Sequence, residues 1–187
     1  MFNFDRITIP QIVAHLKGIA ADEKIDAEEE ALHLIAQKAD GAMRDALSIF
    51  DQMASFGTEG KISYQEVIDN LNILDYDYFF KVVDTFLAGD ISAALVLFNE
   101  ILQKGFDGEL FLHGLANHMR DLLVAQNASS QQLLEKSKEI AGRYHKQSQE
   151  VSASFIVNAI NILGETGTTY KTSRNQRLHI ELALIKL

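Results

Sequence analysis

Residues Asp40–Gln52 read DGAMRDALSIFDQ, and this stretch carries the clearest signal for the fold. Apolar residues recur there every three or four positions, the spacing that places side chains on one face of an α-helix. The residues with this spacing are Met43, Ala46, Leu47, Phe50, Met53 and Ala54. Asp40 and Gly41 stand just before the face, where the N-terminal cap of a helix is expected. The stretch therefore predicts an amphipathic helix with one buried face.

Arg44 falls in the first turn of this helix and off its apolar face. A cation there opposes the helix dipole, at a cost of roughly 0.3–1 kcal/mol at an exposed site. Free backbone N–H groups and a guanidinium that converge on one helix end can bind a phosphate. The alternative is a surface arginine that pairs with Asp40 or Ser48, an interaction of roughly a few tenths of a kcal/mol. The residues alone favour the surface pair.

The same stretch resembles the sensor 2 helix of AAA+ clamp-loader ATPases, above all that of the gamma/tau subunits of bacterial DNA polymerase III. The residues that match the family pattern are Gly41, Arg44, Asp45, Ala46, Leu47, Ser48, Asp51 and Gln52. Ala42 departs from it, because the family often has Ser there. The resemblance implies that Arg44 senses the γ-phosphate of ATP in the intact protein, and that Asp40, Gly41 and Asp45 support the turn and the helix.

Composition limits the possible classes of protein. The 187 residues are 47% hydrophobic and 23% charged, as in ordinary globular proteins, and a single proline leaves little room for the turns of an all-β fold. Without cysteine there is no disulfide or thiolate zinc site. The start lacks the apolar run of a signal peptide, so a cytoplasmic location is expected. A net charge of −9 argues against direct DNA binding by this chain.

Residues 1–68 are predicted to form a bundle of three to four helices. Thr8 is a suitable N-cap with Pro10 in the first turn, and Asp26 is expected to open the second helix, which has an acidic start. Ser63 and Glu66 have the spacing of a capping box before a further short helix. By resemblance, this part is the AAA+ lid.

Residues 69–187 are predicted to form a second all-α domain of five to six helices. Leu133–Tyr144 is a weakly amphipathic helical stretch, and Gly164–Ser173 is expected to be a loop. The last helix, Asn175–Leu187, is apolar nearly all round, so it is either central or packed against another subunit. This half resembles the clamp-loader collar, which implies oligomerisation through this helix; the residues assigned to that contact are Leu178, Leu182 and Ile185.

No pattern in the chain is typical of a catalytic or metal site. The six histidines lack the spacing of metal ligands, so we interpret them as core or surface imidazoles. The aromatic cluster Tyr76, Tyr78, Phe79 and Phe80 is interpreted as a core or collar contact. A P-loop and an acidic Walker B strand are also missing from the sequence, so ATP hydrolysis by this chain alone is not expected.

The family resemblance implies that the ATPase core and its zinc ribbon precede Phe2, and that the intact subunit uses ATP with magnesium. The implied partners are the delta and delta-prime subunits and further gamma/tau copies, with the sliding clamp and primer-template DNA reached through the whole complex. The alternative is a freestanding helical adaptor that binds partner helices and has no link to a nucleotide.

Overall fold

The computed structural model describes residues 7–56, 60–127, 129–130 and 133–187. Within these residues the secondary structure is ten α-helices and two strands of two residues each, which confirms the all-α prediction. The chain divides into two compact units. Unit 1 is Met1–Ile73 with Glu135–Ser137, and unit 2 is Leu74–Leu134 with Lys138–Leu187. The main division lies a few residues after the boundary expected at residues 68/69.

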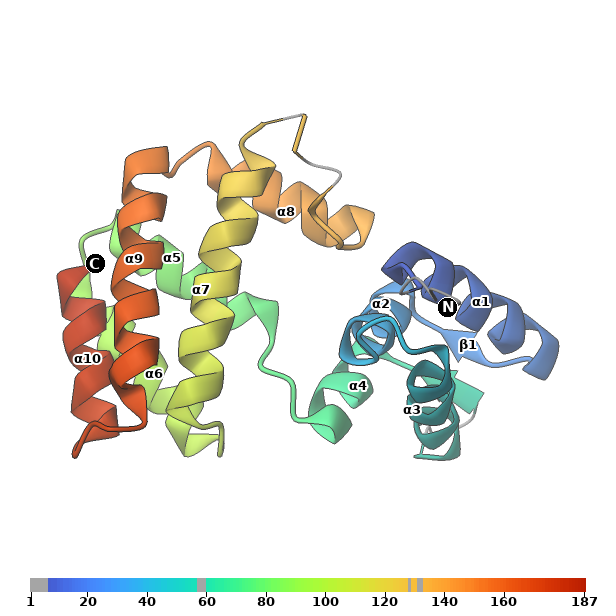
Figure 1. Cartoon of the computed structure of the whole chain (residues 1–187). Coiled ribbons are helices and arrows are strands. Elements are labelled where there is room, and N and C mark those ends of the chain that lie inside the picture. Colours follow the sequence, from blue (N-terminus) through green and yellow to red (C-terminus); the bar gives the residue numbers. More distant parts are fainter. Residues whose placement is uncertain (1–6, 57–59, 128, 131–132) are drawn as a thin grey trace, which may run out of the picture. The chain divides into compact units, whose positions relative to one another are not determined.

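Unit 1 is a small bundle in which α1, α2, α3 and α4 bury one face each (Figure 1). Its elements are α1 (Ile9–Glu23), β1 (Asp26–Ala27), α2 (Glu29–Lys38), α3 (Met43–Phe56), β2 (Lys61–Ile62) and α4 (Tyr64–Leu71). Burial of apolar surface supplies the main driving force for this packing. The buried apolar residues of this unit include Ile12, Leu16, Leu32, Ile35, Phe50, Met53 and Val67.

Two helix starts in unit 1 have the caps that the sequence predicts. The backbone N–H of Thr8 donates to Oε1 of Gln11 at 3.0 Å, and Pro10 lies in the first turn of α1. At α4 the backbone N–H of Glu66 donates to Oγ of Ser63 at 3.3 Å, while the N–H of Ser63 donates to Oε2 of Glu66 at 2.9 Å. The capping box is therefore confirmed, and these bonds satisfy N–H groups that a helix start leaves free.

The prediction that Asp26 opens a helix is wrong. Asp26 and Ala27 form β1, which pairs in parallel with β2, and α2 begins only at Glu29. The Glu28 side chain accepts the backbone N–H of Tyr64 at 2.8 Å and lies 3.4 Å from Nζ of Lys61. Contacts to residues far along the chain thus hold this segment extended, and local sequence carries no sign of them.

Unit 2 is built on α7, which packs along α9, while α10 packs against α9 and α6 (Figure 1). Its helices are α5 (Tyr76–Leu87), α6 (Ile91–Gln103), α7 (Gly108–Ala125), α8 (Lys138–Ser148), α9 (Ala153–Tyr170) and α10 (Gln176–Lys186). One continuous apolar core joins them. Asp90, Asp107 and Ser152 each accept a backbone N–H at the start of a helix.

The loop expected at Gly164–Ser173 is in fact the last part of α9, which runs to Tyr170. Thr166 and Tyr170 are buried and continue the face of α9 that packs on α7. The hydroxyl of Thr166 donates to the carbonyl of Ile162 at 2.7 Å. Tertiary packing overrides the weak helix propensity of glycine and threonine here.

The helix expected at Leu133–Tyr144 is displaced. The helix of the structure, α8, begins at Lys138 and continues to Ser148. Its buried face includes Gln147 and Ser148 beside Ile140 and Tyr144. A search for apolar periodicity misplaces such a helix because half of its buried face is polar.

The Phe79 side chain of α5 lies directly against Gly114 of α7. A Cβ atom added to Gly114 would lie 2.2 Å from Cζ of Phe79, so no larger residue fits unless the Phe79 ring moves. Phe79 stacks on Phe111 with ring centroids 6.2 Å apart. Phe79 and Phe80 are buried in the core, and Tyr76 and Tyr78 are partly buried and pack against it, which agrees with the interpretation of the cluster as a core or collar contact.

None of the helices in the described residues is long and apolar enough to cross a lipid bilayer.

Replacing Gly114 by Ala should destabilise unit 2 by about 1–3 kcal/mol, because the added methyl group overpacks the Phe79 ring. Gly164→Ala is the matched control, since nothing lies within 4 Å of its added Cβ, and it should stabilise α9 by about 0.5–1 kcal/mol. Denaturant unfolding of the two variants measures both effects. Equal free energies of unfolding for Gly114→Ala and Gly164→Ala would contradict the close contact between Phe79 and Gly114.

Removing the α4 cap with Ser63→Ala should lower the free energy of unfolding by about 0.5–2 kcal/mol at pH 7. The backbone N–H of Ser63 and then its hydroxyl lower the pKa of Glu66 below its usual value of 4.5. Ser63→Ala keeps the N–H and removes only the hydroxyl's part, which is complete above pH 4.5 and is lost as the pH falls through the lowered pKa of folded Glu66. The difference between the wild type and Ser63→Ala should shrink at pH 3, whereas exposed Ser92→Ala should change little at either pH.

Candidate functional site

The sequence-predicted phosphate site lies at the start of α3, where the chain turns sharply after α2. Asp40 and Gly41 both have left-handed backbone conformations, with φ of 46° and 83°. Ala42, not Asp40 or Gly41, immediately precedes the helix, and its carbonyl accepts the N–H of Ala46 at 3.1 Å. Asp40 and Gly41 therefore form the turn that aims α3, with Gly41 suited to a φ that most side chains disfavour.

Arg44 is the second residue of α3, and its side chain is exposed. Its guanidinium makes no ion pair or hydrogen bond with any residue that the structure describes. The hydroxyl of Ser48 donates to the backbone carbonyl of Arg44 at 2.9 Å, so Ser48 does not occupy the guanidinium. The local pairing with Asp40 or Ser48, the alternative from sequence, is not formed within the described residues.

The remaining predicted residues of this region are close in sequence but lie on different sides of α3. Asp45 follows Arg44 and is exposed, on a different side of α3. On the same helix, Ala46, Phe50 and Met53 are buried, as the apolar periodicity predicts. The start of α3 thus combines the positive end of a helix dipole with an exposed guanidinium that is unpaired among residues 7–56 and the other described ranges, an arrangement that favours an anionic ligand.

The second predicted site, on α10, has an apolar stripe open to solvent. Leu178, Leu182 and Ile185 are exposed to 46%, 46% and 47%, although each is a large aliphatic residue. Positions i, i+4 and i+7 lie on one face of a helix, so these residues form a single stripe, which we call the α10 stripe. The opposite face holds Ile180 and Leu184 in the core of unit 2.

Polar contacts fix α10 on unit 2 and so define which face stays open. Arg177 donates to Oδ1 of Asn99 on α6 at 3.1 Å and to Oε1 of Glu181 at 2.8 Å. Nε2 of His179 lies 2.8 Å from the hydroxyl of Thr169 on α9. The contacts to Asn99 on α6 and to Thr169 on α9 would both break if α10 rotated to turn the α10 stripe inward.

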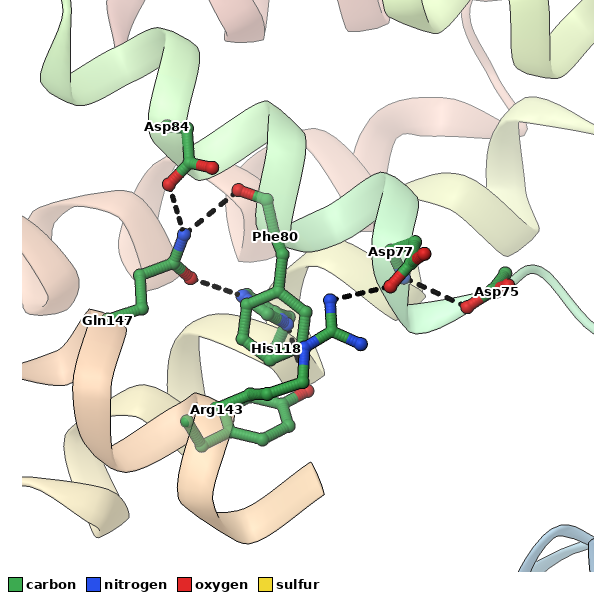
Figure 2. Close-up of polar contacts among 8 residues, drawn as sticks. Asp75, Asp77, Phe80, Asp84, His118, Arg143 and Gln147 are labelled. Carbon is green, nitrogen blue, oxygen red and sulfur yellow. Dashed lines mark hydrogen bonds and ion pairs between the residues drawn. The ribbon is translucent and has the colours of Figure 1, made fainter. Parts of the chain in front are cut away.

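A buried polar chain in unit 2, which no sequence pattern indicated, joins α5, α7 and α8 (Figure 2). His118 of α7 is 1% exposed, and both ring nitrogens are bonded. Its Nδ1 lies 2.8 Å from the hydroxyl of Tyr144, and its Nε2 lies 3.1 Å from Oε1 of Gln147. The interpretation of this histidine as a core imidazole is confirmed.

The acceptors around Gln147 assign the direction of these hydrogen bonds. Its Nε2 donates to the carbonyl of Phe80 at 2.9 Å and to Oδ1 of Asp84 at 2.7 Å. The other amide atom facing His118 is therefore the oxygen, so Nε2 of His118 is the donor and, in the neutral ring, Nδ1 accepts from Tyr144. The two ring nitrogens of His118, the hydroxyl of Tyr144 and the amide of Gln147 all have hydrogen-bond partners, and these bonds tie α8 to α5 and α7.

The surface beside this chain is a groove of about 670 Å³ with charges of both signs. Arg143 lies 4.3 Å from the centroid of the Phe80 ring and pairs with Asp77 (Figure 2). Lys146 and Glu150 also line the groove. Asp84 and Glu150 balance the charges of Arg143 and Lys146, and the described residues that line the groove include no nucleophile with an adjacent base.

Metal-binding geometry is also missing from the described part of the chain, where no three His, Cys, Asp or Glu residues converge. Burial lowers the pKa of His33 on α2, so this imidazole is neutral at pH 7.

The two predicted sites, at Arg44 and on α10, belong to different units.

Two family models match the chain and together cover most of it. The ATPase lid domain of the DNA polymerase III clamp loader subunit matches residues 11–59, and domain III of DNA polymerase III subunits gamma and tau matches residues 62–187. The first match contains α3 with Arg44, and the second contains α10.

Individual proteins agree with the family models. The chain is 30% identical to the tau subunit of DNA polymerase III from Bacillus subtilis over its whole length, but spans only 33% of that protein. It is 37% identical over 114 residues to the gamma/tau subunit of Mycoplasma genitalium, with 61% of the chain and 19% of that protein covered.

Among solved structures, the Bacillus subtilis DNA clamp loader delta protein shares the fold. The TM-score is 0.55 at 14% sequence identity, with all of this chain and 58% of that protein covered. With family models matching residues 11–59 and 62–187, the second of which covers more than half of the chain, the chain belongs to the gamma and tau subunit family of DNA polymerase III.

Proposed function

We propose that this chain couples ATP sensing to subunit assembly in a clamp loader that places the sliding clamp on DNA during replication. Unit 1 senses the nucleotide through Arg44, and unit 2 holds the subunit in its assembly. The observation that carries this function is the exposed guanidinium of Arg44 at the start of α3, which pairs with none of the residues that the structure describes. An exposed guanidinium of this kind can bind an incoming phosphate.

The sensing step needs only one charged contact that depends on the nucleotide. ATP, held with magnesium by a separate ATPase core, presents its γ-phosphate to the guanidinium of Arg44. The left-handed turn at Asp40 and Gly41 fixes the direction of α3, and with it the position of this guanidinium. Hydrolysis removes the phosphate partner, so the preferred orientation of unit 1 on the core changes.

Hydrolysis itself belongs to the ATPase core of the full-length subunit. Among the described residues of this chain there is no cluster of metal ligands, and the sequence lacks a P-loop. The chain therefore contributes a sensor to the reaction rather than the groups that cleave ATP.

Assembly is assigned to unit 2 and to the α10 stripe. An apolar stripe that stays exposed on a folded domain is typical of a protein–protein interface. The partners are the delta and delta-prime subunits and further gamma or tau copies, while the sliding clamp and primer-template DNA are bound by the whole complex. A net charge of −9 agrees with a role in protein contacts rather than direct DNA binding.

A freestanding helical adaptor without a nucleotide link remains the second candidate function, because the α10 stripe would serve it equally well. The two functions differ at Arg44, which an adaptor does not need. The following experiment separates them.

In the full-length subunit, Arg44→Ala should leave assembly intact but weaken ATP-dependent clamp loading by about 10- to 100-fold, the value of one hydrogen bond to a charged group. Arg44→Lys should recover part of the loss, because it keeps the charge but not the planar fork. Arg174→Ala, an exposed arginine in unit 2, is the control. Clamp loading is measured against ATP concentration, and normal ATP coupling in Arg44→Ala would exclude the sensor role.

Leu182→Glu should keep the melting temperature of the chain close to that of the wild type but impair assembly of the full-length subunit. The side chain is 46% exposed, so a charge there is hydrated in the free protein and becomes costly only when a partner covers it. Leu110→Glu, at an exposed position of α7, is the control. Light scattering over a concentration range gives the mass, and unchanged assembly in Leu182→Glu would rule out the α10 stripe as an interface.

A further inference from the structure

The backbone segment before α1 is hydrogen-bonded to the turn that precedes α3. The N–H of Ile7 donates to the carbonyl oxygen of Gly41 at 3.3 Å, although the two residues are far apart in the chain. Gly41 has a left-handed backbone, with φ of 83°, and stands three positions before Arg44. The bond therefore reaches the chain directly before the first turn of the helix that carries the guanidinium.

The first turn of α3 lies ahead of the residues that the core holds. The buried residues of this helix are Ala46, Phe50 and Met53, and all three follow Arg44. Helix ends fray where packing does not hold them. The position of Arg44 therefore depends on what fixes the start of the helix.

The peptide unit between Gly41 and Ala42 leads into α3 and is held on both of its sides. Its N–H, which belongs to Ala42, donates to the carbonyl of Ala39 at 2.9 Å, and its carbonyl accepts the N–H of Ile7. Because the unit is planar, two bonds on opposite sides fix its tilt, whereas one bond leaves it able to pivot. Glycine has the least restricted backbone of any residue, so the second bond matters most here.

The donor stands on a firm base at the start of α1. The N–H of Thr8 donates to Oε1 of Gln11 at 3.0 Å, and the N–H of Ile12 donates to the carbonyl of Thr8 at 3.0 Å. Ile12 is fully buried, and α1 packs against α3 in the core of unit 1. The bond from Ile7 thus fastens the start of α3 to the capped start of α1.

We infer that Ile7 is a positioning residue for nucleotide sensing: its backbone N–H, through the Gly41 carbonyl, holds the first turn of α3 where Arg44 meets the γ-phosphate. The inference rests on the sensor role of Arg44 proposed above. The donor is a backbone group, so Ile7→Val, which keeps it, should keep the function. Loss of the bond should weaken binding of ATP, which has a γ-phosphate, and not of ADP, which lacks one.

The test removes this N–H in the full-length subunit by placing the α-hydroxy analogue of isoleucine at position 7, which turns the peptide bond into an ester. The affinity for ATPγS, a slowly hydrolysed ATP analogue, should fall about three- to tenfold in calorimetry, the value of one net hydrogen bond. The affinity for ADP should stay unchanged. An equal loss for both nucleotides, the mark of a merely structural role, would overturn the inference.

The same hydroxy acid at Ile9 is the matched control. Ile9 is the first residue of α1, where a helix has no internal partner for the N–H, so its removal costs no bond within the helix. This ester and Ile7→Val should both leave the two affinities unchanged. A fall in ATPγS affinity at Ile9 as large as at Ile7 would contradict the role of the Ile7 bond.

Arg44→Ala separates this inference from the proposed function. If Arg44→Ala lowers the affinity for ATPγS relative to ADP and the Ile7 ester lowers it no further in that variant, the bond acts through Arg44. An ester effect that persists in Arg44→Ala, or that is missing when Arg44 is present, refutes the positioning role alone. Unchanged affinities in Arg44→Ala refute the sensor role itself.

Discussion

The close contact between Phe79 and Gly114 sets the geometry on which unit 2 depends. A glycine at this position of α7 lets the Phe79 ring of α5 lie against the helix backbone. The same ring stacks on Phe111 and lies 6.0 Å from the imidazole of His118, measured between ring centroids. His118 in turn bonds to Tyr144 and Gln147 of α8. One apolar contact thus places a buried histidine, and the hydrogen bonds that this histidine requires determine where α8 packs.

In unit 1 the corresponding constraint is the turn that starts α3. Two consecutive left-handed residues, Asp40 and Gly41, end α2 and aim the next helix. The outer face of α3 then has opposite chemistry along its length, with the donor Arg44 near its start and the acceptor Asp51 two turns later.

The α10 helix shows why composition alone does not distinguish a central helix from an interface helix. The sequence is apolar nearly all round, and both interpretations follow from it. In the structure, Ile180 and Leu184 pack in the core, whereas Leu178 and Leu182 are almost half exposed. The bonds of Arg177 to Asn99 and of His179 to Thr169 are compatible with this orientation and add to it. Neither contact could be foreseen, because the partner residues lie on α6 and α9.

The sequence by itself determined the all-α class, the caps at Thr8 and Ser63 and the buried face of α3, because helical periodicity and capping depend on neighbours within four positions. It also indicated Arg44 as a candidate functional residue, since a cation in the first turn of a helix is opposed by the helix dipole. Only the tertiary structure decided that Asp26 joins a strand, that α9 continues through Gly164, and that Gln147 belongs to the core. These outcomes rest on contacts between residues far apart in the chain, whose energies exceed the local preferences, and no pattern of neighbouring residues encodes them.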